Sequence, residues 1–340
     1  MAAPHFRGLA LDEFPQIFGR ALVARGCVRD DVLERLVHPW RVEGFRKSRI
    51  ESPDDRLGRS LREEQAASPG PPFKPAPHGI IGGDFIFVTG QIAHGFNEAG
   101  LAPEARLDPE TWYGSHVKQQ AEVALSRCAN VLTHVGASMA DVVRADVYLN
   151  DMGERFELEE VWKKHFPKYP PARTYIPTVR LGARSCIIEV NVIAIRPGSG
   201  LKKETIMACN VPVPDMHHPH AIRAGQLIFV SGLCSTDFRN GLAPEARVHP
   251  GAPWFASNGR KQTAFILDCM EAICRAGGSS LSNVAWTQNF YSRPEDVCSS
   301  MEIWNERFPS EPPATLVAGV GNLAFGEGCT IHIDAVAAVR

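Results

Sequence analysis

Two stretches of the sequence carry side chains that could do chemistry. Arg173 follows Pro170-Pro171-Ala172, and a guanidinium group is a planar set of N–H donors suited to a carboxylate. The second stretch, Met216-His217-His218-Pro219-His220, gathers imidazoles that could bind a transition metal together with Asp334. Its spacing matches no established metal signature. We therefore expect a histidine-rich linker and no metal, and we interpret Arg173 as a carboxylate-binding group, with a solvated loop arginine as the alternative.

The chain repeats itself at the scale of a domain. Phe85 to Gly90 returns 142 residues later as Leu227 to Gly232, and the Pro-Pro-Ala motif returns as well. Units this long indicate duplicated domains rather than a stacked array of short repeats. The two copies differ where chemistry is expected, because Arg173 becomes Thr315 in the second copy.

The repeat and the composition divide the chain into four parts. Residues 1–74 are expected to be a helical extension followed by a proline-rich linker, and residues 75–197 the first repeated domain. Residues 198–218, rich in proline and glycine, join it to the second domain at residues 219–340. Each repeated domain is long enough to bury its own core.

Hydrophobic periodicity predicts the elements that must position these side chains. In the first copy, a short apolar run that stops at a glycine predicts a strand over 84–90, and alternating apolar residues predict strands over 143–149 and 188–194. Helical spacing predicts helices over 117–135 and 158–166. The second copy repeats this order. We expect an α+β fold in which each copy has a mixed sheet with two helices on one face. The uncovered face of each sheet then requires a partner.

Composition narrows the function classes. The net charge of -2, with both signs mixed along the chain, disfavours nucleic acid and anionic membranes as partners. The nine cysteines include no CxxC pair, and the chain shows no signal-peptide pattern and no apolar run long enough for a membrane helix. We therefore expect a cytoplasmic protein in a reducing compartment.

Several motifs together resemble the Rid family, also called YjgF-like. They occur in the same order in both copies, which makes the resemblance specific. In the first copy they are 87–91 (Phe-Val-Thr-Gly-Gln), 141–149, 156–162, 171–173 (Pro-Ala-Arg) and 188–194. The resemblance implies a chorismate-mutase-like fold, homo-oligomers with ligand clefts between neighbouring units, hydrolysis of imines and enamines, and neither metal nor other cofactor.

The resemblance also implies site residues. It matches Arg173 to the arginine that holds the substrate carboxylate and Glu189 to the glutamate that positions the attacking water. Asn191 shares the face of Glu189 on an alternating strand and could hold the same water. His78 falls near a family tyrosine, although its counterpart His220 equally suggests a structural role. The expected substrate-binding set is Arg173, Thr89, Gly90, Gln91, His78 and Asn191.

The second copy departs from the family pattern. Thr315 replaces the arginine, His332 aligns with Glu189, and Leu233 aligns with Gln91. This copy is therefore expected to be a degenerate partner that completes the assembly and walls the cleft of the first copy.

Three functions remain open from the sequence. The leading one is a hydrolytic deaminase of a small carboxylate-bearing imine or enamine, of the 2-aminoacrylate or 2-aminomuconate type. The others are a non-catalytic binding or regulatory protein and a chorismatase-like reaction on a carboxylated ring. A homotrimer is the assembly preferred by analogy.

Overall fold

The computed structural model describes residues 47–50, 77–95, 100–110, 113–251 and 257–339, with side chains from residue 77 onward. The helices predicted within residues 1–62 lie outside the described residues, except that Lys47–Ile50 forms strand β1. Both repeated copies belong to one compact unit that begins at Lys47.

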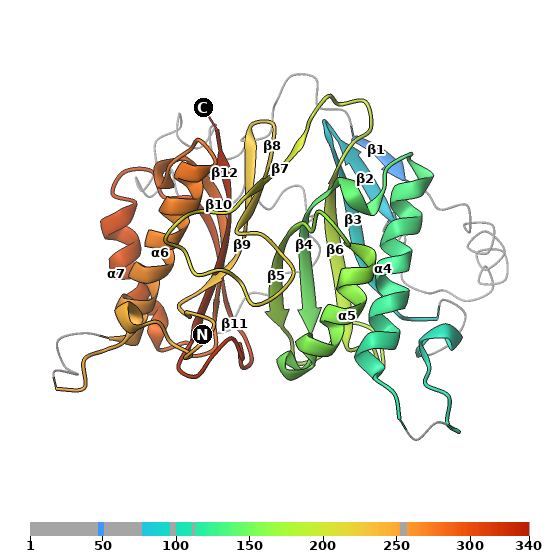
Figure 1. Ribbon diagram of the computed structural model, residues 1–340, viewed down its shortest axis with the longest axis horizontal. Coiled ribbons are helices and arrows are strands. Elements are labelled where there is room, and N and C mark those ends of the chain that lie inside the picture. The colour runs from blue at the N-terminus through green and yellow to red at the C-terminus, as the bar shows by residue number, and fades with distance from the viewer. Residues whose placement is uncertain (1–46, 51–76, 96–99, 111–112, 252–256, 340) are drawn as a thin grey trace, which may run out of the picture. The chain divides into compact units, whose positions relative to one another are not determined.

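The first copy forms a six-stranded sheet with two helices (Figure 1). Its strands run in the spatial order β1-β2-β3-β6-β4-β5, and only β4 and β5 pair in parallel. The elements are β1 (Lys47–Ile50), β2 (Gly79–Gly82), β3 (Phe85–Ile92), α4 (His116–His134), β4 (Val142–Leu149), α5 (Arg155–His165), β5 (Ala172–Pro177) and β6 (Ile188–Ile195).

The second copy repeats this arrangement. Its sheet has the order β11-β10-β12-β9-β8-β7, again with one parallel pair, β10 with β11. The elements are β7 (Lys203–Ile206), β8 (Ala221–Ala224), β9 (Leu227–Cys234), α6 (Asn258–Ala276), β10 (Val284–Tyr291), α7 (Asp296–Arg307), β11 (Ala314–Gly319) and β12 (Ile331–Ala338). The α+β fold with two tandem mixed sheets is therefore confirmed.

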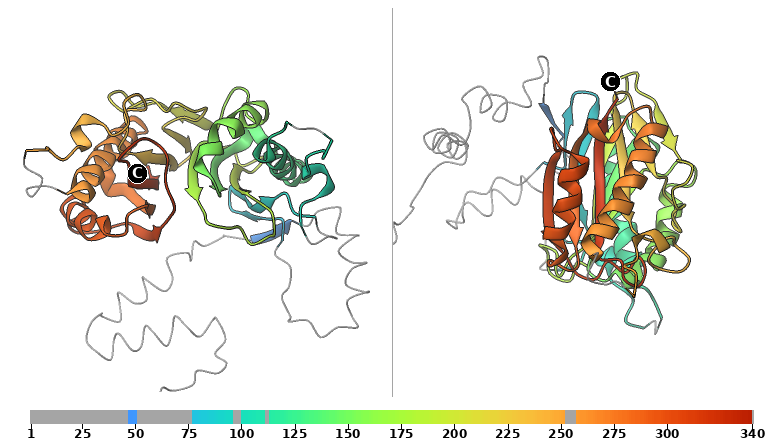
Figure 2. Two further views of the ribbon diagram at one scale, coloured as in Figure 1. Left: turned by 90° about the horizontal axis from the view of Figure 1, so that it is seen from below. Right: turned by 90° about the vertical axis from the view of Figure 1, so that its left-hand side faces the viewer.

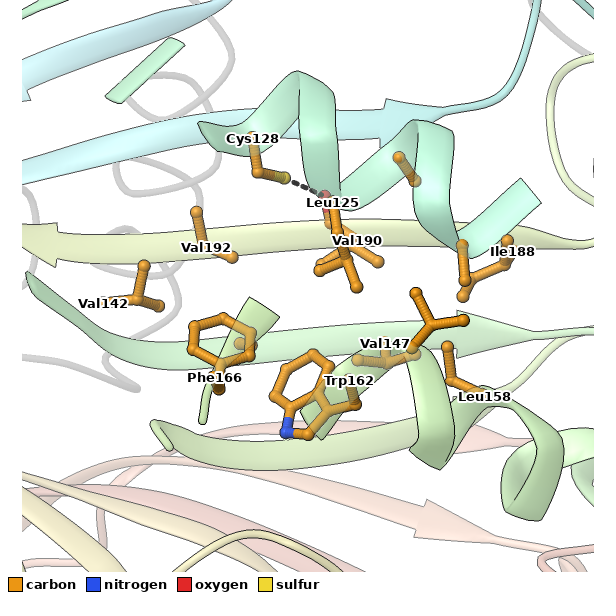
Figure 3. Close-up of a cluster of buried hydrophobic side chains, with 14 of the residues drawn as sticks. Leu125, Cys128, Val142, Val147, Leu158, Trp162, Phe166, Ile188, Val190 and Val192 are labelled. Atoms are coloured by element: carbon orange, nitrogen blue, oxygen red, sulfur yellow. Dashed lines mark hydrogen bonds between the residues drawn. The ribbon is translucent and has the colours of Figure 1, made fainter. Parts of the chain in front are cut away.

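Each pair of helices covers one face of its own sheet, and this face holds the core of that copy. Figure 2 shows α6 and α7 side by side in front of the second sheet. In the first copy, Trp162 and Phe166 of the α5 region pack with Leu125 of α4 against Val190 and Val192 of β6 (Figure 3). The amphipathic spacing of the two helices thus positions the sheet and fixes which strand residues face inward.

A third cluster of buried side chains joins the two copies. It consists of Val143, Ala172, Ile195, Ile222, Ala224 and Phe229, so it draws on strands of both sheets. An ion pair lies in the same interface, where Nη2 of Arg144 in β4 is 2.9 Å from Oδ2 of Asp334 in β12. The uncovered faces of the two sheets therefore meet, as the sequence predicted that they must find a partner.

Candidate active site

Arg173 is a fully buried cation on β5. Its guanidinium Nη2 donates to Oε2 of Glu159 in α5 at 2.8 Å, and no part of the side chain is exposed. The guanidinium carbon lies 4.4 Å from the centre of the Trp162 ring and 4.7 Å from that of the Tyr175 ring. Aromatic faces of this kind stabilise a desolvated cation. Arg173 therefore points toward the helices rather than into solvent.

Two nitrogens of this guanidinium remain available. Nε and Nη1 of Arg173 are buried and have no hydrogen-bond partner among the described residues. An unsatisfied buried donor costs about 1–3 kcal/mol, so an anion that accepts from these groups would recover that free energy. This arrangement is able to bind a carboxylate.

The second copy supplies the other side of the Arg173 environment. The backbone N–H of Arg173 donates to the hydroxyl of Ser231 in β9 at 3.1 Å, and that hydroxyl donates to the carbonyl of Pro219 at 2.7 Å. Gly232 follows Ser231 and lies so close to the His332 ring that an added Cβ would meet Nε2 at 1.9 Å. Position 232 must therefore be a glycine for His332 to keep this place.

His332 of the second copy and His218 of the segment between the copies are buried near β5, where they interact with the Tyr175 backbone and with Arg173 respectively. Burial lowers the pKa of His332 to about 4, partly opposed by hydrogen bonding with the backbone at Gly232 and Tyr175. Burial and, next, the charge of Arg173 lower the pKa of His218 to about 3. Both imidazoles are therefore neutral near pH 7, and Nδ1 of His332 is buried without a partner among the described residues.

A small cavity lies beside His218. It has a volume of about 20 Å³ and is lined in part by His218, His220, Ser231, Gly232 and Cys234. This is room for about one water molecule, in surroundings that offer polar partners. This volume has room for a water molecule but not for a substrate.

The segment between the copies closes over Arg173. Trp162 donates from Nε1 to the carbonyl of His217 at 3.0 Å, and the backbone N–H of His217 donates to Oε1 of Glu159. Met216 is buried in the core of the first copy. Because the Arg173 side chain is not exposed and this segment contacts two of its neighbours, we expect the segment to move when a ligand binds.

Glu189 lies elsewhere. It alternates with Ile188 and Val190, which face the helices, so its side chain points from the opposite face of the sheet. Burial raises the pKa of the Glu189 carboxyl. An added Cβ at Gly90 would meet Oε1 of Glu189 at 1.9 Å and Oδ1 of Asn191 at 2.7 Å. Within one chain, the structure does not bring Glu189 together with Arg173.

The other expected site residues belong to the Glu189 side of the sheet or its edge. Thr89 is exposed and donates from Oγ1 to the carbonyl of Pro77 at 2.6 Å. Gln91 donates from Nε2 to the carbonyl of Thr89 at 2.6 Å, and the carbonyl of His78 accepts from the Thr89 N–H at 2.9 Å. Thr89, Gly90, Gln91 and His78 therefore gather at β3, with Glu189 and Asn191 on the adjacent β6.

Comparison with known proteins decides the family. The family model described as Endoribonuclease L-PSP matches this chain twice, over residues 70–196 and 209–339. The chain belongs to the endoribonuclease L-PSP family. The resemblance to Rid proteins and the tandem arrangement, with two whole copies in one chain, are thereby confirmed.

Relatives in this family are about as long as one copy. A RutC family protein of Pyrococcus abyssi is 32% identical over 127 residues, which are 37% of this chain and 89% of the relative. Escherichia coli TdcF, whose name places it among the reactive intermediate deaminases, is 24% identical over 125 residues, 36% of this chain and 87% of its own. The crystal structure of yeast Mmf1 aligns over 41% of this chain and 100% of its own, at 16% identity and a TM-score of 0.35.

The histidine cluster of this L-PSP chain makes hydrogen bonds within the protein. Nδ1 of His220 accepts from the Ala208 N–H at 3.0 Å, while Nε2 contacts the Pro212 carbonyl at 3.0 Å. His217 contacts the Phe166 carbonyl through Nε2 at 2.7 Å. Among the described residues, no three His, Cys, Asp or Glu side chains are placed to hold a metal ion.

Two further observations concern a buried thiol and the expectation of no membrane helix. Cys234 is buried, and burial raises the pKa of its thiol well above the usual value, so it is not a ready nucleophile. In the part of the chain that the structure describes, no helix is long and apolar enough to cross a bilayer.

Sequence reasoning missed Glu159 and Tyr175. Glu159 lies in the predicted helix, one turn before Trp162, and its position on the buried face is the signal that could have revealed it. Tyr175 lies two residues after Arg173 on a strand that the apolar pattern did not predict. Both contact the guanidinium group and thus decide what Arg173 can bind.

Proposed function

We propose that this chain hydrolyses a small imine or enamine that carries a carboxylate, and that the reaction takes place in the cleft between its two copies. The unpartnered Nε and Nη1 of the buried Arg173 are the observation that carries the proposal. A substrate carboxylate accepts from these groups, in a desolvated site where such charge-assisted hydrogen bonds are strong.

The reaction balances without a cofactor. Water adds to the carbon of the C=N group, the resulting carbinolamine loses ammonia as the C–N bond breaks, and a keto compound remains. For a neutral imine both protons of the water end on the departing nitrogen, so that C=NH and H₂O become C=O and NH₃. An enamine first tautomerises to the imine. The protein must therefore hold the carboxylate, aim one water and accept or relay a proton.

We infer that His332 aims that water beside Arg173. It occupies the register position of Glu189, since His332 pairs with Phe290 as Glu189 pairs with Tyr148. Its neutral ring and its unpartnered Nδ1 can accept a hydrogen bond from water. Glu189 remains the proposed water-positioning group only for a cleft formed on its own face of the sheet.

Family membership supports the same class of reaction. TdcF, a relative of this chain, carries the name of a reactive intermediate deaminase. The substrate type, either 2-aminoacrylate-like or 2-aminomuconate-like, is part of the proposal and follows from the need for a carboxylate beside a C=N group.

The second candidate function is non-catalytic. In this case Arg173 binds a carboxylate without further reaction, or binds no ligand. The ion pair between Arg173 and Glu159 favours it, because an internal carboxylate already neutralises the guanidinium. Under this hypothesis the Arg173 cleft would only stabilise the contact between the two copies.

One assay separates the two candidates. A PLP-dependent dehydratase generates 2-aminoacrylate or 2-iminobutyrate, and release of the 2-keto acid is followed with and without this protein. We expect acceleration by the wild type and none by Arg173→Met/Glu159→Gln, which removes both charges and so leaves no uncompensated buried ion. Equal rates with wild type and the double variant would favour the non-catalytic candidate.

A further inference from the structure

Arg155 is a second buried arginine beside the proposed site. It is the first residue of α5, four residues before Glu159, so the two side chains share one face of the helix. Arg155 is only 8% exposed. Within the described residues, its guanidinium donates from Nη1 to the Met152 carbonyl at 2.8 Å and makes no ion pair. Because buried arginines are normally paired with an anion, this guanidinium lacks a partner that a buried cation usually has.

Aromatic rings connect this guanidinium to Arg173. The guanidinium carbon of Arg155 lies 5.8 Å from the centre of the Phe325 ring. That centre is 6.4 Å from the centre of the Tyr175 ring, which lies 4.7 Å from the guanidinium carbon of Arg173. The centre of the His332 ring is 4.7 Å from that of Phe325. Both cations therefore border one pair of aromatic rings, and His332 lies against one ring of that pair.

Polar atoms without a partner lie around the same rings. The Tyr175 hydroxyl is buried and has no hydrogen-bond partner among the described residues. The same is true of Nε and Nη1 of Arg173 and of Nδ1 of His332. These side chains come from β5 of the first copy and β12 of the second. Since buried polar groups are nearly always hydrogen-bonded, this gathering indicates a ligand that offers polar groups at more than one point.

The carboxylate of Asp215 acts on Arg155 without forming an ion pair with it. Burial lowers the pKa of the Arg155 guanidinium, and the negative charge of Asp215 is the largest of the effects that oppose this. Asp215 is exposed and directly precedes Met216 and His217, in the segment that we expect to move when a ligand binds. That movement would also displace Asp215. An anionic group of the ligand could then take its place beside Arg155.

We propose that Arg155 binds a second carboxylate, so that the substrate is an imine or enamine of a dicarboxylic acid. This inference rests on the proposed function, in which Arg173 holds the carboxylate next to the C=N group. The far carboxylate accepts from the Arg155 guanidinium in a charge-assisted hydrogen bond. The carbon chain between the two carboxylates lies on the Phe325 and Tyr175 rings, which favour an apolar or unsaturated chain. Arg155 thus determines specificity and takes no part in the hydrolysis itself.

Binding of two matched keto acids tests the second carboxylate. 2-Oxoadipate and 2-oxohexanoate have carbon chains of equal length and differ only in the far carboxylate. In calorimetric titrations of the wild type, we expect 2-oxoadipate to bind about 10- to 100-fold more tightly, as for one charge-assisted hydrogen bond. Arg155→Met should abolish this preference. Arg196→Met, at a more exposed arginine of the same copy, is the control and should retain it.

Asp215→Asn tests the same contact in the opposite direction. Because Asp215 is exposed, this variant should fold as the wild type does, so it also serves if Arg155→Met fails to fold. Removing the competing negative charge should strengthen the binding of 2-oxoadipate more than that of 2-oxohexanoate. An unchanged ratio of the two affinities in Asp215→Asn would contradict the place given to the far carboxylate.

The outcomes separate this proposal from the proposed function. Equal binding of the two acids by the wild type, or a preference that Arg155→Met retains, would overturn the second carboxylate and leave the deaminase standing. Binding of neither acid, or binding that Arg173→Met/Glu159→Gln does not weaken, would refute the carboxylate site at Arg173 and this proposal with it. Selective binding of 2-oxoadipate by a wild type that accelerates no imine hydrolysis would support the second carboxylate and contradict the deaminase.

Discussion

Arg173 and Glu189 extend from opposite faces of the same sheet. Arg173 contacts Glu159 and Trp162 of α5, whereas Glu189 lies against Gly90 on the face away from the helices. In the proposed site, a substrate held by the guanidinium would therefore meet side chains of the second copy, chiefly His332 and Ser231, rather than Glu189. The copy with Thr315 at the equivalent position would thus contribute the other half of the proposed site.

Replacing Arg173 by lysine should separate charge from donor geometry. Lys retains the positive charge but lacks the planar N–H groups and stacks less well on Trp162 and Tyr175. We expect kcat/KM for 2-iminobutyrate hydrolysis to fall about 10- to 100-fold, as for loss of one charge-assisted hydrogen bond. Arg180→Lys, at an exposed position, is the control and should leave kcat/KM unchanged. Equal rates for the two variants would remove Arg173 from the site.

A matched pair of glycine substitutions should locate the reaction. Gly232→Ala places a methyl group against Nε2 of His332, and Gly90→Ala places one against Oε1 of Glu189, each at 1.9 Å. Each side chain must then move. We expect Gly232→Ala to lower kcat at least about 10-fold, because His332 would no longer aim the water, and Gly90→Ala to have little effect. The reverse pattern would assign the chemistry to Glu189.

More of the fold than of the candidate site could be predicted from the sequence. Apolar periodicity located the strands at 143–149 and 188–194 and both helices of the first copy, and the repeat extended them to the second. It did not predict β5, because the run after Pro171 mixes polar and apolar residues that are all buried. It also did not predict β7, four residues in the segment interpreted as a linker.

The side chains that share a cleft with Arg173 could not be predicted from the sequence, and the reason again lies in the packing of the two copies. Matching motifs assign Arg173 and Glu189 to one copy, but the cleft that each side chain enters depends on how the copies pack. That packing is set by interface residues such as Arg144 and Asp334, whose pairing across the interface no periodicity reveals.

Acid should destabilise the protein through its buried histidines. The pKa of His332 is lowered from 6.5 to about 4, so the folded state binds fewer protons than the unfolded state between these values. The stabilisation by the neutral ring is complete above pH 6.5 and is lost as the pH falls toward 4. Between pH 7 and pH 5, the wild type should lose about 2 kcal/mol more unfolding free energy than His332→Gln in urea titrations. Parallel losses in the two proteins would contradict the buried, neutral state of His332.

Removing one partner of the ion pair between the copies should destabilise the protein more than removing both partners. Arg144→Met leaves Asp334 buried without its cation and should lower the unfolding free energy by about 3–5 kcal/mol. Arg144→Met/Asp334→Leu should recover most of this loss. Arg196→Met, which breaks an exposed pair with Asp84, should cost at most about 1 kcal/mol. Calorimetric melting of the three variants measures these losses. A loss for Arg144→Met no larger than that for Arg196→Met would contradict the burial of Asp334 and mean that solvent reaches the interface.

The most direct test of the account is a crystal structure of the wild type with a 2-keto acid product such as 2-oxobutyrate. We expect one carboxylate oxygen within hydrogen-bond distance of Nε or Nη1 of Arg173, the His217 segment displaced, and the keto carbon toward His332. A carboxylate bound only on the Glu189 face of the sheet, with Arg173 still closed off by Glu159, would contradict the account.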